Sequence, residues 1–183
     1  MVDTFAPMAR PLPELSLSDW TVLGVVAEGP THGWPVVREL APDGDLGRVW
    51  TVSRPLVYRS LGTLEHAGLV EPCGEAPGIR GPHRVVLRAT PTGRGALRRW
   101  LAMPVAHVRD VRSQLLVKLA LLERAGRSSR DLVAAQLDAL APVFDAVKRP
   151  GRRRGLDATV IAWRREQALA VERFLRAQLK RPD

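Results

Sequence analysis

The sequence predicts a mainly α-helical protein with one small β-hairpin, organised in two parts. Three observations lead to this prediction. Apolar residues recur every three or four positions over most of the chain, as on one face of an α-helix. Gly and Pro residues interrupt these runs at the points where helices would end. The segment 70–87 instead has two short extended runs around a Gly- and Pro-rich loop, which is typical of a two-stranded hairpin.

The composition is that of a folded protein with a large excess of positive charge. The chain has 183 residues, of which 45% are hydrophobic and 26% charged, and its net charge is +9. The first 47 residues contain two Arg and seven acidic residues, so the positive charge lies after them. Such a basic balance favours a polyanionic partner such as nucleic acid.

The sequence also limits where the protein acts. Cys73 is the only cysteine, which excludes an intrachain disulfide. No apolar run approaches the roughly 18 residues needed to cross a bilayer, and the N-terminus does not resemble a signal peptide. We therefore expect a soluble, cytoplasmic protein with no membrane partner.

The chain is expected to begin with an irregular arm, residues 1–15, followed by three helices. Ser16 or Ser18 can cap the first helix, and Gly29-Pro30 ends it. The second helix would begin near Thr31 and end before Pro42.

A third helix is marked at both ends. Ser53 can cap it, Pro55 suits its first turn, and Gly68 suits the left-handed conformation that ends many helices. Its inward stripe would consist of Leu56 or Val57, followed by Leu61 and Leu64.

Met103-Pro104 is the expected boundary between an N-terminal unit, residues 16–103, and a C-terminal helical unit, residues 104–183. Beyond the boundary, Pro142 is expected to kink or interrupt a helix whose apolar seam ends near Val147. The last helix, from Leu156 to about Lys180, is apolar on more than one face and so needs partners on two sides. The residues expected at a dimer interface are Val160, Trp163, Val171, Phe174 and Leu175.

Three helices followed by a two-stranded hairpin are typical of the winged helix-turn-helix, in which the third helix enters the major groove of DNA. Arginine, serine and tyrosine side chains on its outer face would then reach base edges and phosphates. The residues expected to contact DNA are Thr31, His32 and Gly33 before the second helix, Ser53, Arg54, Tyr58 and Arg59 on the third, and Arg80, His83 and Arg84 in the wing.

Several motifs occur in a fixed order along the chain. They are the turn Gly29-Pro30-Thr31-His32-Gly33-Trp34, the segment Leu56–Val70 with Tyr58, Leu61, Leu64, Glu65 and Gly68, and Thr90-Pro91-Thr92-Gly93 followed by Trp100. With the helical tract Val111–Leu122, they resemble the PadR family of transcriptional regulators. The resemblance implies a homodimer that binds an inverted repeat in double-stranded DNA, usually as a repressor released by a small molecule. It also implies that the C-terminal helices form a helical dimerisation domain.

Other functions have less support. The four histidines and Cys73 show no metal-ligand spacing, and no nucleotide-binding loop or nucleophile motif is present, so neither an enzyme nor a cofactor or metal site is expected. Trp20, Trp100 and Trp163 are candidates for an aromatic effector pocket, although buried tryptophans more often belong to the core. Two alternatives stay open: a dimeric protein- or ligand-binding module whose winged helix does not bind DNA specifically, and a protein that coats DNA regardless of sequence.

Overall fold

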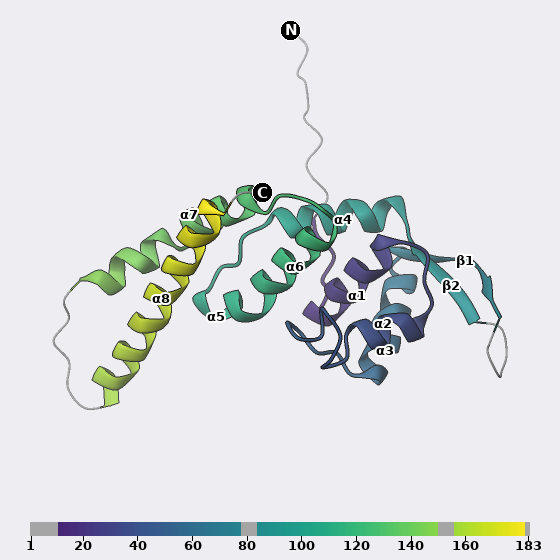
Figure 1. Cartoon of the computed structure of the whole chain (residues 1–183), viewed down its shortest axis with the longest axis horizontal. Helices are drawn as coiled ribbons and strands as arrows, with labels where there is room; N and C mark the ends of the chain where they lie inside the picture. Colours follow the sequence, from purple (N-terminus) through teal and green to yellow (C-terminus); the bar gives the residue numbers. More distant parts are fainter. Residues whose placement is uncertain (1–10, 78–83, 150–155, 182–183) are drawn as a thin grey trace, which may run out of the picture.

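The computed structural model describes residues 11–77, 84–149 and 156–181, and it is mainly helical with one two-stranded hairpin (Figure 1). The structure has two parts, a winged unit and a helical arm. The winged unit, residues 17–102, contains α1 (Leu17–Glu28), α2 (Gly33–Glu39), α3 (Arg54–His66), β1 (Val70–Ala76), β2 (Arg84–Ala89) and α4 (Pro91–Ala102). The helical arm, residues 108–180, contains α5 (Val108–Asp110), the π-helical turn η1 (Val111–Leu115), α6 (Leu116–Arg124), α7 (Arg130–Lys148) and α8 (Leu156–Lys180).

Helix α1 forms the centre of the winged unit. Its first turn is closed by a capping box, in which Ser16 Oγ accepts from the amide of Asp19 and the Asp19 carboxylate accepts from the amide of Ser16. The residues from Trp20 to Val26 are all buried, so neighbours cover α1 on every side. The rings of Trp20 and Trp100 stack with centroids 5.1 Å apart, which packs α4 onto α1.

Helix α3 begins and ends where the sequence predicts. Ser53 is its N-cap residue, and Gly68 follows it with a φ of 66°, the left-handed conformation that glycine adopts without strain. Val57 is fully buried whereas Leu56 is exposed, so Val57 is the residue that begins the inward stripe. Most of the other exposed residues of α3 are polar, among them Arg54, Tyr58 and Arg59.

The hairpin pairs β1 with β2 in antiparallel register, from Val70 opposite Ala89 to Ala76 opposite Arg84. An additional antiparallel bridge joins Thr31 to Leu87: the amide of Thr31 donates to the Leu87 carbonyl at 2.9 Å, and the amide of Leu87 donates to the Thr31 carbonyl at 2.7 Å. This bridge ties the wing to the turn that precedes α2.

The junction between the two parts, residues 103–107, is held by two buried polar side chains. Lys118 Nζ donates to the Met103 carbonyl at 2.6 Å and lies 4.7 Å from the centroid of the Trp100 ring. Gln136 both accepts from the amide of Val105 and donates to its carbonyl. Burial lowers the pKa of Lys118 to about 8, because the interior disfavours its charged form.

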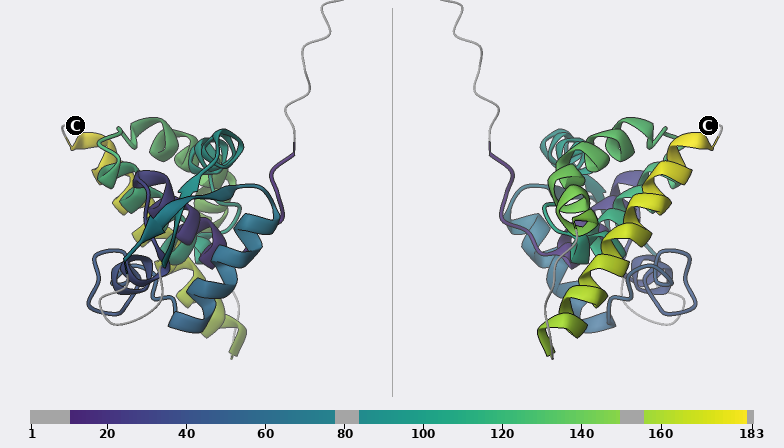
Figure 2. Two further views of the ribbon diagram at one scale, coloured as in Figure 1. Left: turned by 90° about the vertical axis from the view of Figure 1, so that its right-hand side faces the viewer. Right: turned by 90° about the vertical axis from the view of Figure 1, so that its left-hand side faces the viewer.

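Helices α7 and α8 pack side by side, with Phe144 and Leu175 buried between them (Figure 2). Hydrogen bonds from Lys148 and Arg176 lower the pKa of Glu172, which keeps this carboxylate charged. The expectation that Pro142 interrupts its helix is wrong, since α7 continues through it. Pro142 is exposed and so is Asp138, four residues earlier, so water can serve the Asp138 carbonyl that loses its helical hydrogen bond.

In the described part of the chain, no helix is long and apolar enough to cross a membrane. The His, Cys, Asp and Glu side chains of that part form no group of three or more that could hold a metal ion. Cys73 is an exposed free thiol.

Candidate nucleic-acid interface

The start of α2 lies directly against the outer face of α3. A Cβ atom added to Gly33 would lie 2.5 Å from Cε1 of Tyr58, so a side chain at position 33 would displace the Tyr58 ring. Arg54 places its guanidinium carbon 5.9 Å from the ring centroids of both Trp34 and Tyr58. These three exposed residues, Trp34, Arg54 and Tyr58, are called the cationic–aromatic face below.

A groove of about 890 Å³ separates this face from the wing. It brings together five of the residues that the sequence predicts for DNA contact: His32, Gly33, Arg54, Tyr58 and Arg84. Glu65 and Glu75 also line it, so the groove contains two arginine and two glutamate side chains. The arrangement offers guanidinium and phenol donors from two elements on one side of the molecule.

The other predicted DNA contacts are placed differently. Ser53 and Arg59 are exposed on α3 but do not line the groove. The amide of Thr31 is not free for a phosphate, because the Leu87 carbonyl accepts it. Arg80 and His83 lie outside the described residues.

Trp34 is a residue of this face that was not predicted from the sequence. It is 46% exposed, and the Arg54 guanidinium lies over its ring. The signal in the sequence was its place directly after His32-Gly33, at the start of α2.

A second cavity, of about 350 Å³, lies between α1, α4 and α6. Its apolar lining comes from Gly24, Ala27, Leu97, Leu101 and Leu121, and its charged lining from Glu28, Arg94, Arg98, Arg124 and Arg127. The structure does not bring Trp20, Trp100 and Trp163 together around this cavity or any other described one. Trp20 and Trp100 cover each other in the core, whereas Trp163 is 64% exposed on α8.

The predicted dimer residues divide along α8. Val160 and Trp163 are exposed, together with the neighbouring Ile161, and Val171 and Phe174 are partly buried. Leu175 is fully buried within the chain against α7, so it belongs to the core of the arm rather than to a free surface.

The winged unit has three helices around a buried centre and a hairpin bridged to the turn before α2. Together with the exposed arginines of α3, these features define a DNA-binding protein of the winged helix-turn-helix class. A sequence model of the family described as "Transcriptional regulator PadR-like family" matches residues 22–99, the span from α1 to α4. The winged unit is thus similar to the PadR-like transcriptional regulators. This family consists of regulators of transcription, not of enzymes.

The solved structures that match the chain include proteins from two bacteria. Bacillus subtilis PadR in complex with operator DNA has 16% sequence identity and a TM-score of 0.45, with 88% of this chain and 97% of that one covered. The same protein with p-coumaric acid has 16% identity and a TM-score of 0.44, covering 90% and 97%. The protein smu.1604c from Streptococcus mutans UA159 has 14% identity and a TM-score of 0.42, covering 89% and 98%. No curated protein matched the sequence.

Proposed function

We propose that this protein is a cytoplasmic repressor that binds an inverted-repeat operator as a homodimer and is released by a small molecule. The observation that carries the proposal is the cationic–aromatic face, with Arg54 held between Trp34 and Tyr58 and with Arg84 across the groove. A winged helix used only to bind a protein would tend to present an apolar surface at this place. Exposed guanidinium and phenol groups instead suit base edges and phosphates.

Dimerisation is supported by the exposed apolar residues at the start of α8. Leu156, Val160, Ile161 and Trp163 are between 38% and 78% exposed in the single chain. A second copy placed about a two-fold axis would cover these side chains with the same set from its own α8. The same symmetry would set two α3 helices about one turn of DNA apart, which matches an inverted repeat.

The effector would occupy the cavity between α1, α4 and α6. Its apolar lining suits an aromatic or otherwise apolar body, and Arg98 and Arg127 in the lining suit an acidic group on the same molecule. The other two arginines of the lining already have partners: Arg94 donates to the Ala89 carbonyl, and Arg124 donates to Glu28 and Glu39. Because its walls belong to both the winged unit and the helical arm, a ligand there would favour one relative position of the two parts.

DNA titration tests the proposal. A duplex selected from a random-sequence pool by the wild-type protein, and a scrambled duplex of equal length, are titrated at several salt concentrations. Specific binding should survive competitor DNA and weaken steeply with salt. Arg54→Ala should reduce affinity about tenfold or more, as expected for loss of a base or phosphate contact. Arg112→Ala, which removes the same charge from the exposed surface of the helical arm, should have a much smaller effect.

Each outcome decides between the alternatives. Equal binding to both duplexes would indicate a protein that coats DNA regardless of sequence. If the wild-type protein selected no duplex, the result would favour the alternative of a protein- or ligand-binding module. Benzoate and larger aromatic acids, added to the preformed complex, should release the selected duplex if the effector belongs to the proposed class.

A further inference from the structure

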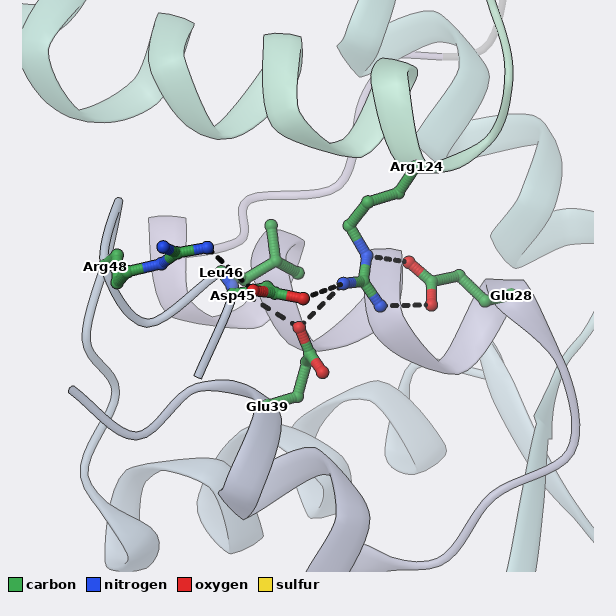
Figure 3. Close-up of polar contacts among 6 residues, drawn as sticks. All are labelled: Glu28, Glu39, Asp45, Leu46, Arg48 and Arg124. Carbon is green, nitrogen blue, oxygen red and sulfur yellow. Dashed lines mark hydrogen bonds and ion pairs between the residues drawn. The ribbon is translucent and has the colours of Figure 1, made fainter. Parts of the chain in front are cut away.

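One guanidinium of the helical arm joins three elements of the winged unit (Figure 3). Arg124, the last residue of α6, donates from Nε and Nη2 to the two carboxylate oxygens of Glu28, both at 2.7 Å. Its Nη1 donates to Glu39 Oε1 at 2.7 Å and lies 4.0 Å from an oxygen of Asp45. Glu28 ends α1, Glu39 ends α2, and Asp45 lies in the segment that leads to α3.

The two glutamates sit where their own helices disfavour them. The C-terminal end of a helix carries partial negative charge, so a carboxylate in the last residue is repelled by it. The last turn of α1 contains no basic residue that could offset this repulsion. Arg124 therefore supplies the compensating charge for Glu28, and its bidentate geometry fixes direction as well as distance.

The surroundings make these contacts stronger than ordinary surface ion pairs. The Arg124 and Glu39 side chains are only 27% and 24% exposed, which reduces screening by solvent and salt. The hydrogen bond to Glu28 raises the pKa of Arg124 and outweighs the desolvation that lowers it, so the guanidinium stays charged. Glu39 Oε1 also accepts the amide of Leu46 at 3.4 Å, which extends the connection into the segment before α3.

Helix α6 is itself closely seated on α1. A Cβ atom added to Gly24 would lie 2.6 Å from both terminal carbons of Leu121, one helical turn before Arg124. The position of Arg124 is thus set by the packing of the arm. Arg124 in turn adds a polar contact to the end of α2, beside the core packing of Val36 and Leu40. At the other end of α2, Gly33 and Trp34 contact Tyr58 and Arg54 of the cationic–aromatic face.

We infer that Arg124 is a positioning residue for DNA binding, which makes the orientation of α2 and of the cationic–aromatic face depend on where α6 lies. This inference rests on the proposed DNA binding at that face. Arg124 itself need not touch DNA. It acts by holding the end of α2 to the end of α1, so that the two helices and the arm keep one arrangement.

The test compares three variants of the full-length chain on the selected duplex. Arg124→Gln removes the ion pairs, Arg124→Lys keeps the charge but cannot reproduce the bidentate and bridging geometry, and Arg112→Gln is the matched control for loss of one exposed arginine. We expect about tenfold weaker specific binding for Arg124→Gln, a smaller loss for Arg124→Lys, and almost none for Arg112→Gln. Binding to the scrambled duplex should change equally in Arg124→Gln and Arg112→Gln, because both lose one charge.

Thermal unfolding of each variant shows whether a variant that binds the selected duplex weakly is still folded. If Arg124→Gln does not fold, Glu39→Gln replaces it, since this change breaks only the contact to α2 and leaves the Arg124–Glu28 pair. It should then weaken specific binding in the folded protein. Specific affinities that are equal in wild type, Arg124→Gln and Glu39→Gln would overturn the inference. Failure of the wild type to select any duplex would instead overturn the proposed function.

Discussion

The winged unit and the helical arm bury their apolar residues in different ways. In the winged unit, α1 is enclosed by its neighbours. Three of the four exposed large apolar side chains described in this unit, Trp34, Tyr58 and Val85, line the groove beside the wing. In the arm, α8 buries Ala168 and Leu175 in its second half, while four large apolar side chains stand exposed in its first half. A single chain therefore completes the core of the winged unit, whereas the arm has an apolar surface that a single chain does not cover.

The largest expected effect comes from the core of the winged unit. Leu64→Ala removes a fully buried side chain from α3 and should lower the free energy of unfolding by about 2 to 5 kcal/mol, because the packed surroundings cannot fill the cavity. Urea denaturation followed by circular dichroism measures this. Leu56→Ala is the matched control on the same helix, exposed by 39%, and should cost about 0.5 kcal/mol or less. Similar losses in the two variants would contradict the packing described for α3.

The next effect concerns the uncovered surface of the arm. Trp163→Ala should weaken self-association about a hundredfold, or about 2.7 kcal/mol, as expected when a central interface tryptophan is removed. Sedimentation equilibrium over a range of protein concentrations measures the dissociation constant. Trp34→Ala removes an exposed tryptophan from the winged unit and should leave that constant unchanged. A wild-type protein that is monomeric at high concentration would remove the basis for this comparison.

The smallest effect lies at the junction, where Lys118 is buried. Below pH 8 the folded protein must hold a buried ammonium, whereas above pH 8 it releases this proton and the unfolded chain keeps it until about pH 10.5. The unfolded state then binds more protons, so stability should rise by up to about 2 kcal/mol between pH 8 and pH 10. The stability of wild type relative to Lys118→Met, followed by urea denaturation, should show this rise. A constant difference across that range would mean that Lys118 keeps an ordinary pKa.

The sequence predicts the helices and strands well because their signals are local. Ser16 with Asp19, Ser53 with Pro55, and Thr90 each mark a helix start within a few residues, and Gly68 marks an end. Pro142 shows the limit of such signals. Its effect depends on whether the carbonyl it leaves unpaired faces water, which only the packing of α7 decides.

The candidate site was predicted only in part, because local signals do not show which distant residues meet. Arg54 and Tyr58 follow from the spacing of inward residues on α3, but the contact of Trp34 with Arg54 depends on the angle between two helices. The pairs made by Arg124 join residues 96 and 85 positions apart in the chain. No local pattern distinguishes this arginine from the other basic residues of so basic a protein.

The bridge between Thr31 and Leu87 has a mechanical consequence. Two hydrogen bonds fasten the hairpin to the turn before α2, so the hairpin cannot swing toward or away from a bound duplex without dragging that turn along. The hairpin, this turn and α2 are therefore expected to move as one unit. The close packing of α6 on α1 couples the helical arm to the same unit.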